Sequence, residues 1–271
     1  MPNRIDDIFS SLRSESRKAL MPFVCAGHPV GPGEPAALAP ILQALERGGA
    51  SIVEVGIPFS DPIADGAVIA AAMHEALVAG ITPAAIFDQV RAARESTRLG
   101  LVAMVSVSIA QRLASGGEPF FSRLRNAGFD GAIIPDVPLE ESGPLVKAAA
   151  DNGVTLSLLV SPSTNPKRAE EIVKVCTGFV YVLARAGLTG EQSDAPDISK
   201  MIGRLRQMTS LPLAVGFGIS TAAHVREVVK HADAAIVGSV MVRRLDAAAK
   251  AGQDVVAAAE AFTRELAGGL A

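Results

Sequence analysis

The chain has 271 residues, of which 49% are hydrophobic and 20% are charged, and its formal net charge is −3 at pH 7. A chain of this length and apolar content can bury one large core, and a single domain of this size is normal for an α/β barrel. Lys and Arg are scattered along the chain, which argues against a nucleic-acid-binding or membrane-surface protein and favours a small-molecule ligand.

The first segment of the chain has the character of a packed helix. It lacks the apolar core of a signal peptide, and its apolar residues follow amphipathic helix spacing at Ile5, Ile8, Phe9 and Leu12. The longest uncharged stretch, 207–225, contains a proline and two glycines, which is unsuitable for a membrane span. We therefore expect a soluble, cytoplasmic protein.

Cys25 and Cys176 are too few and too far apart to form a disulfide framework. Neither has a neighbouring Cys or His at metal-ligand spacing, so we expect no metal site at either cysteine. Both are interpreted as reduced thiols of the core.

Short apolar runs, several rich in β-branched residues, alternate with segments of helical periodicity, as parallel α/β folds require. They are Ala19–Cys25, Ser51–Gly56, Gly100–Val107, Gly131–Ile134, Thr155–Val160, Phe179–Leu183, Leu213–Val215 and Ala234–Val237. These eight runs predict a closed (β/α)₈ TIM barrel with an additional N-terminal helix, and no linker divides 1–271 into more than one domain. An open doubly wound sheet is the alternative, but the turn after its first strand would be expected to carry G-x-G-x-x-G, which A-G-H-P-V-G-P-G does not match.

Between the first two runs, one helix is predicted from a shared apolar face of Leu38, Ile41, Leu42 and Leu45. The helix should stop at the glycine pair Gly48-Gly49, and Pro40 predicts either a late start or a kink. The alanine-rich tail, 246–271, is also apolar at helical spacing.

Three acids lie at the end of the second run and in the segment after it, in the sequence E-V-G-I-P-F-S-D-P-I-A-D-G from Glu54 to Gly66. The apolar run places Glu54 toward the interior, where a carboxylate either finds a hydrogen bond or shifts its pKa, so it could exchange protons near neutral pH. A paired structural acid is the alternative for Glu54. Asp65 precedes a glycine and could be only a turn residue, and Asp61-Pro62 could equally be a docking surface.

Glycine-bearing segments follow the last two runs, V-G-F-G-I-S at 215–220 and I-V-G-S-V at 236–240. Barrels often bind phosphate at these positions, because glycine lets backbone N–H groups approach an anion. A helix beginning near Ser239 would also point its positive end toward that anion. A polar loop, 184–192, follows the sixth run and could either cover the barrel mouth or remain an ordinary surface loop. Tyr181 precedes that loop and needs a hydrogen-bond partner if it is buried.

Six segments of the chain occur in the order found in the tryptophan synthase alpha chain family, which the sequence resembles along essentially its whole length. They are P-F-V-x-A-G at 22–27, E-V-G-I-P-F-S-D-P-I-A-D-G at 54–66, P-D-V-P-L-E-E-S at 135–142, R-A-G-L-T-G at 185–190, G-F-G-I-S at 216–220 and G-S at 238–239. The resemblance implies a TIM-barrel lyase that cleaves indole-3-glycerol phosphate to indole and glyceraldehyde 3-phosphate by a retro-aldol reaction. It also implies that no metal or organic cofactor takes part, and that indole passes to a beta chain in an α₂β₂ complex.

The resemblance also implies roles for individual residues. Glu54 would be the acid and base of the cleavage, and Asp65 would accept the indole N–H. The remaining expected substrate-binding residues are Phe23, Ile133, Tyr181 and Phe217 around the indole, and Gly190, Gly218, Gly238 and Ser239 around the phosphate. The loop of Arg185 would close through a hydrogen bond between Thr189 and Asp65. Residues expected toward the beta chain are Pro58, Asp61, Pro62 and Asp136.

The chain departs from the family pattern at several places. Ala67 and Ala70 stand where proline and glutamine are usual, and M-V-S-V-S at 104–108 replaces M-x-Y-x-N. His28 stands where aspartate is common, and a lone histidine after a strand is typical of a hydrogen-bonded loop residue. These differences leave Glu54 and Asp65 in place but affect the expected partner surface.

Three functions therefore stay open from the sequence. The first is an alpha chain that works with a beta chain, and the second is a stand-alone indole-3-glycerol phosphate lyase. The third is a weakly catalytic subunit kept for binding and activating a beta chain. Retention of Glu54, Asp65 and the phosphate glycines argues against the third, because docking alone does not require them.

Overall fold

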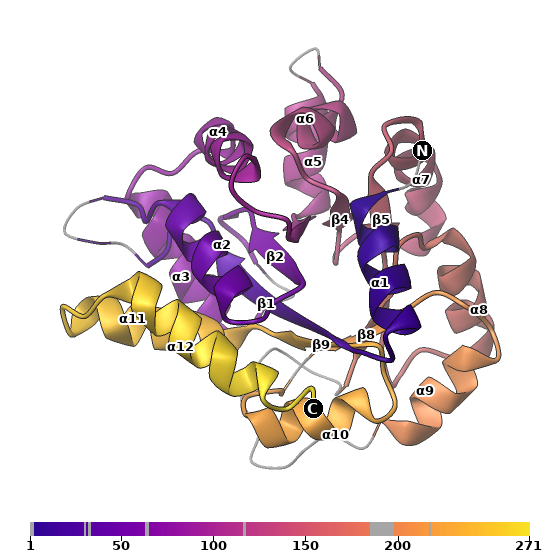
Figure 1. Cartoon of the computed structure of the whole chain (residues 1–271). Coiled ribbons are helices and arrows are strands. Elements are labelled where there is room, and N and C mark those ends of the chain that lie inside the picture. The colour runs from indigo at the N-terminus through magenta and orange to yellow at the C-terminus, as the bar shows by residue number, and fades with distance from the viewer. Residues whose placement is uncertain are drawn as a thin grey trace.

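The computed structural model describes residues 3–29, 31, 34–62, 65–115, 118–184, 198–216 and 218–271. The strands in these ranges are β1 (Ala19–Cys25), β2 (Ile52–Gly56), β3 (Gly100–Met104), β4 (Gly131–Ile133), β5 (Thr155–Ser157), β6 (Leu159–Val160), β7 (Val180–Leu183), β8 (Leu213–Gly216) and β9 (Ala234–Val237). All pair in parallel, in the order β5-β4-β3-β2-β1-β9-β8-β7-β6. The strands form the centre of the molecule and the helices surround them (Figure 1).

The ring of strands closes through the segment that contains β5 and β6, which lie at the two ends of the strand order and are separated only by Leu158. The N–H of Thr177 donates to the carbonyl of Leu156 at 2.9 Å, and that of Tyr181 donates to the carbonyl of Leu158 at 3.2 Å. The expected (β/α)₈ barrel is therefore confirmed. The predicted single strand Thr155–Val160 is interrupted at Leu158, whose N–H points to the sulfur of Cys176 at 3.3 Å.

The helices alternate with the strands along the chain. Their bounds are α1 (Arg4–Ser14), α2 (Leu38–Arg47), α3 (Ala67–Val78), α4 (Pro83–Arg94), α5 (Val107–Ala114), α6 (Phe120–Ala127), the 3₁₀ turn η1 (Leu139–Glu141), α7 (Ser142–Asp151), α8 (Pro166–Val175), α9 (Ser199–Arg206), α10 (Ala222–Val229), α11 (Ser239–Lys250) and α12 (Val255–Ala267). No single helix in the described ranges is long and apolar enough to cross a membrane, although α3 and α4, bent by 99°, reach that length and composition as a pair.

Helix α1 closes the end of the barrel at which the strands begin, and it lies across the opening in Figure 1. Asn3 caps it by accepting the N–H of Ile5 at 2.8 Å, while its amide donates to the carbonyls of Asp130 at 2.7 Å and Gly153 at 2.8 Å. The buried side chains of α1 join the inward residues of the strands in one apolar cluster. Each such side chain contributes about 1.5–3 kcal/mol through burial. The predicted N-terminal helix is therefore confirmed, and it is α1.

Two further helix predictions are refined by the structure. Helix α2 begins at Leu38 and ends at the C-cap Gly48, so Pro40 lies in its first turn, where a missing N–H costs no intrahelical bond. The predicted third strand was too long, because β3 ends at Met104 and Val107 begins α5. The hydroxyl of Ser106 caps α5 by accepting the N–H of Ser108, which turns the chain out of the sheet. Cys25 and Cys176 are buried free thiols, as predicted.

Candidate active site

Glu54 lies on β2 among the inward residues of the barrel, next to Phe23 of β1 and Val102 of β3 in the strand register. Its side chain is 1% exposed, and its Oε1 has no hydrogen-bond partner among the described residues. Burial raises the pKa of this carboxyl well above its usual value, and the charge of Asp65 raises it further. The raised pKa favours the protonated form of Glu54, which can give its proton to a bound molecule.

Asp65 lies directly before the N-terminus of α3, and its backbone N–H donates to the carbonyl of Pro62 at 3.0 Å. Burial, followed by the charge of Asp136, raises the pKa of the Asp65 carboxyl from 3.8 to about 6. Asp65 is thus mostly ionised at pH 7, whereas the raised pKa of Glu54 favours its protonated form. Two nearby carboxyls with different protonation states are suited to one acid role and one electrostatic role.

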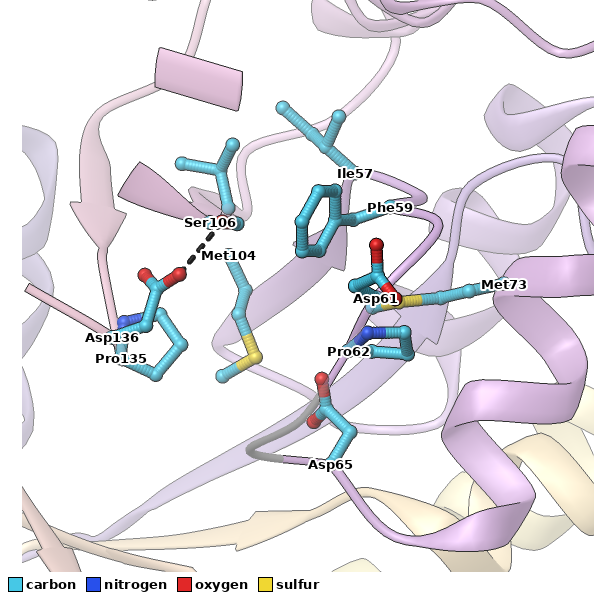
Figure 2. A pocket seen from close by; sticks show the side chains of 11 residues that line it. Ile57, Phe59, Asp61, Pro62, Asp65, Met73, Met104, Ser106, Pro135 and Asp136 are labelled. Carbon is cyan, nitrogen blue, oxygen red and sulfur yellow. Dashed lines mark hydrogen bonds between the residues drawn. The ribbon is translucent and has the colours of Figure 1, made fainter. Parts of the chain in front are cut away.

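A small hollow of about 30 Å³ lies where β2, β3 and β4 end. Figure 2 shows Asp65 with its carboxylate directed toward Met104 and Pro62. The lining is apolar except at a few points, and it comprises Ile57, Phe59, Asp61, Pro62, Asp65, Met73, Met104, Val105, Ser106, Pro135 and Asp136. Its position at the carboxyl ends of the strands is the position of active sites in barrels of this kind.

Asp136 is fixed at the edge of this hollow by the start of α5. Its Oδ2 accepts the hydroxyl of Ser106 at 2.6 Å, which Figure 2 draws as a dashed line, and its Oδ1 accepts the N–H of Val107 at 2.8 Å. Ser106 is one of the residues at which the chain departs from the family pattern. Its hydroxyl is one of two donors to Asp136, the other being the N–H of Val107, and the charge of Asp136 acts on Asp65.

Two aromatic rings cover glycines of neighbouring strands at the inner wall. A methyl group placed on Gly56 would lie 2.4 Å from Cζ of Phe23, and one placed on Gly216 would lie 2.5 Å from the hydroxyl oxygen of Tyr181. Tyr181 is 5% exposed, and burial, together with the charges of Glu54 and Asp65, raises the pKa of its phenol well above 10.0. The phenol is therefore a neutral hydroxyl near both carboxyls. Ile133 is fully buried on β4 in the same inner cluster.

The predicted anion site lies where β8 and β9 end. Gly218 has a φ of +76°, which favours glycine, and Gly238 is the N-cap of α11, which begins at Ser239. No side chain in the described part of the chain caps this helix, so its first N–H groups can face an anion. A methyl group on Gly238 would lie 3.9 Å from Cβ of Phe23, which places the helix start beside the aromatic wall.

Several predicted residues lie elsewhere. Arg185, Thr189, Gly190 and Phe217 lie outside the described residues. Of the residues expected toward a beta chain, Asp61 is exposed, Pro62 and Asp136 are half-buried, and Pro58 is buried.

His28 is a buried loop residue with partners, as its position after a strand indicated. Its Nε2 lies 3.2 Å from a carboxylate oxygen of Glu75 and 3.7 Å from one of Asp246. These three residues could hold a metal ion by spacing, since their ligand atoms lie within 4.8 Å of one another. However, the ammonium group of Lys250 lies 2.7 Å from Asp246, so a cation already balances this cluster. Burial lowers the pKa of His28, so the three residues are best described as a hydrogen-bonded polar cluster between the β1 loop, α3 and α11.

The structure also contains functional candidates that sequence reasoning missed. Phe59 and Met73 line the hollow. Phe59 lies within the segment 54–66, whereas nothing in the local sequence marks Met73. His224 of α10 lies against the Gly218–Ser220 segment. Its position four residues after Ser220, on the helix that follows a glycine-bearing loop, was a signal that could have identified it.

The chain matches known proteins along nearly its whole length. The family model described as "Tryptophan synthase alpha chain" matches residues 9–270. The tryptophan synthase alpha chain of Chloroflexus aggregans is 42% identical over 268 residues, covering 97% of each chain. That of Caulobacter sp. (strain K31) is 38% identical over 254 residues, covering 93% of this chain and 90% of its own.

Solved structures agree with the sequence comparisons. The tryptophan synthase alpha subunit of Legionella pneumophila superposes with a TM-score of 0.87 at 28% identity, covering 100% of this chain and 99% of that one. A tryptophan synthase structure from M. tuberculosis in an aminoacrylate-bound form gives a TM-score of 0.84 at 28% identity, with 100% of both chains covered. The barrel, the acidic segment after β2 and these full-length matches lead to one conclusion: the chain belongs to the tryptophan synthase alpha chain family.

Proposed function

We propose that the chain cleaves indole-3-glycerol phosphate to indole and glyceraldehyde 3-phosphate. The observation that carries this proposal is Glu54, a buried carboxyl at the barrel interior whose Oε1 has no hydrogen-bond partner among the described residues. A buried carboxyl oxygen without a hydrogen-bond partner destabilises the fold, which favours a functional role. Barrels place reacting groups at the end where the strands finish. Membership of the family supports the proposal, because this reaction is the one that the resemblance implies.

The cleavage needs two proton transfers at neighbouring carbons. Glu54, whose raised pKa favours the protonated form, gives its proton to C3 of the indole, and the ring nitrogen becomes cationic. The carboxylate then takes the proton of the hydroxyl on the adjacent glycerol carbon. The bond between C3 and that carbon breaks, its electron pair returns to the ring, and the products are indole and the aldehyde.

Asp65 is proposed to stabilise the cationic ring. It is ionised at neutral pH, and its carboxylate can accept the indole N–H as positive charge develops on the nitrogen. Because the surrounding wall is mostly apolar, this charge interaction is stronger than it would be in water.

The phosphate is proposed to bind at Gly218, Gly238 and Ser239, near the uncapped start of α11. Phe23, Ile133 and Tyr181 would form the wall beside the indole ring. The resemblance alone supports the substrate-binding roles proposed for Thr189, Gly190 and Phe217. It alone also supports the proposed closure of the loop of Arg185.

A beta chain is the proposed partner, in an α₂β₂ complex. The support is the family, together with solved neighbours that are tryptophan synthase structures. The exposed Asp61 and the half-buried Pro62 and Asp136, at the end of the barrel where the strands finish, are the proposed docking residues, and Pro58 would support them from beneath.

The test is an assay of the purified chain with indole-3-glycerol phosphate, measuring release of glyceraldehyde 3-phosphate with and without a tryptophan synthase beta chain. We expect slow release that the beta chain strongly accelerates. Fast release without a partner would replace the proposal with a stand-alone lyase. Absence of release in both mixtures would contradict the proposed reaction.

A further inference from the structure

His224 is a buried histidine that touches the backbone of the proposed phosphate segment. It is the third residue of α10, it is 7% exposed, and its backbone N–H donates to the hydroxyl of the N-cap Thr221 at 3.2 Å. Its side chain reaches back past the start of the helix. Its Nδ1 lies 3.2 Å from the carbonyl oxygen of Gly218, 3.4 Å from the N of Ser220 and 3.3 Å from the hydroxyl of Ser220.

Either neutral tautomer of this ring holds the segment. With a proton on Nδ1, the ring donates to the Gly218 carbonyl. With Nδ1 unprotonated, the ring accepts the N–H of Ser220. In both cases Nδ1 joins α10 to the Gly218–Ser220 segment.

The contact matters because Gly218 has a φ of +76°, a conformation that a free chain does not strongly favour over others. The peptide between Gly218 and Ile219 is trans, so its N–H points opposite to its carbonyl. When Nδ1 donates to the Gly218 carbonyl, the Ile219 N–H therefore points away from α10. The same hydrogen bond keeps the carbonyl oxygen from turning toward a bound anion, which the oxygen would repel.

We propose that His224 is a positioning residue that holds the Gly218–Ser220 backbone in the shape that binds the phosphate of the substrate. It acts through the backbone and touches neither the phosphate nor the reacting atoms. This inference rests on the proposed function, because it assigns the phosphate to this segment.

The variants that test it differ in where they place a polar atom. Asparagine carries its amide atoms on Cγ, at the position of Nδ1, and can donate or accept. Glutamine places them one bond farther, near the position of Nε2, and leucine has none. We therefore compare His224→Asn, His224→Gln and His224→Leu in the full-length chain. Controls are Val228→Ala, a buried residue of the same helix, and His231→Asn, an exposed histidine just after it.

The first readout is the dissociation constant for glycerol 3-phosphate, measured by calorimetry, and the second is kcat and KM for indole-3-glycerol phosphate. We expect His224→Leu to weaken glycerol 3-phosphate binding by about tenfold, the equivalent of one lost hydrogen bond. KM should rise by a similar factor with little change in kcat. His224→Asn should restore most of the affinity, and His224→Gln should not. Val228→Ala should lower the denaturation midpoint without changing the affinity.

Two outcomes would overturn the inference. The first is that His224→Leu binds glycerol 3-phosphate as tightly as the unmodified chain. The second is that Val228→Ala loses as much affinity for glycerol 3-phosphate as His224→Leu, which would mean that a general loss of stability is responsible. Failure of the proposed function looks different: the unmodified chain would bind glycerol 3-phosphate, with the same dependence on His224, but would not cleave indole-3-glycerol phosphate.

Discussion

The phenol of Tyr181 lies so close to Gly216 on the neighbouring strand that a methyl group there would come within 2.5 Å of the hydroxyl oxygen. The backbone of β8 is therefore part of the wall against which this ring rests. Because Tyr181 also lies within the influence of Glu54 and Asp65, the glycine helps to set the space beside both carboxyls.

Gly216→Ala should push the Tyr181 ring from its place. We expect a loss of about 1–3 kcal/mol in the free energy of unfolding, as for other overpacked cores, and a lower kcat/KM. Denaturant titration and steady-state kinetics measure the two effects. Gly203→Ala, in α9 with nothing within 4 Å of the added carbon, is the matched control and should not lose stability. Adding Tyr181→Phe to Gly216→Ala should recover part of the lost free energy of unfolding. A Gly216→Ala variant with full activity and unchanged stability would contradict the contact between Tyr181 and Gly216.

Glu54→Gln should keep the fold and abolish cleavage, because the amide preserves the shape of the side chain but cannot exchange protons. General acid–base catalysis of this kind contributes roughly 10²–10⁴-fold to a rate. Turnover with a beta chain present is the measurement, and glycerol 3-phosphate affinity is the control for an intact site. A variant that turns over at a near-normal rate would remove Glu54 from the mechanism.

The same variant should change the pH dependence of stability. The folded-state pKa of Glu54 is raised above 4.5, so the folded chain holds a proton that the unfolded chain has released. Stability of the unmodified chain therefore falls as the pH rises above 4.5, whereas that of Glu54→Gln lacks this fall. Unfolding titrations at several pH values should show the variant gaining relative stability as the pH increases. Parallel curves would mean that Glu54 ionises normally.

Asp65 should govern the acid limb of the pH–activity profile, which is the decline of kcat/KM at low pH. Its pKa is raised from 3.8 to about 6, so kcat/KM should decline as the pH falls through about 6 and the carboxylate becomes protonated. Asp65→Asn should be severely impaired in kcat at every pH. Its stability relative to the unmodified chain should rise between pH 3.8 and about 6, by up to about 3 kcal/mol. An Asp65→Asn variant impaired only in KM would make Asp65 a binding residue.

Asp136→Asn should move that acid limb to lower pH. The charge of Asp136 is the second cause of the raised Asp65 pKa, so its removal lets Asp65 ionise more easily. Ser106→Ala is the matched comparison, because it removes the 2.6 Å hydrogen bond to Asp136 but leaves the charge in place. We expect its acid limb to stay near that of the unmodified chain. If both variants shift the pH profile equally, the hydrogen bond rather than the charge is responsible.

The fold was largely predictable because the signals are local. Apolar runs located the strands, with β1 and β9 at their predicted bounds, and Gly48 ended α2 as expected. The interruption at Leu158 was not predictable, because the sulfur of Cys176 that its N–H faces belongs to another segment. The early end of β3 was also missed, because Val105 and Val107 continue an apolar pattern that looks like a strand.

Local sequence patterns were enough to predict the parallel barrel, the inward position of Glu54 and the glycine segments after the last strands, because periodicity and turn chemistry act over a few residues. Three relationships could be seen only in the folded chain: Asp136 lies close enough to raise the pKa of Asp65, Tyr181 rests on Gly216, and His224 contacts the carbonyl of Gly218. These relationships depend on the register in which distant strands close into a ring and on the burial that follows. Electrostatic and steric effects act through space, so residues far apart in the chain acquire them only when the barrel has formed.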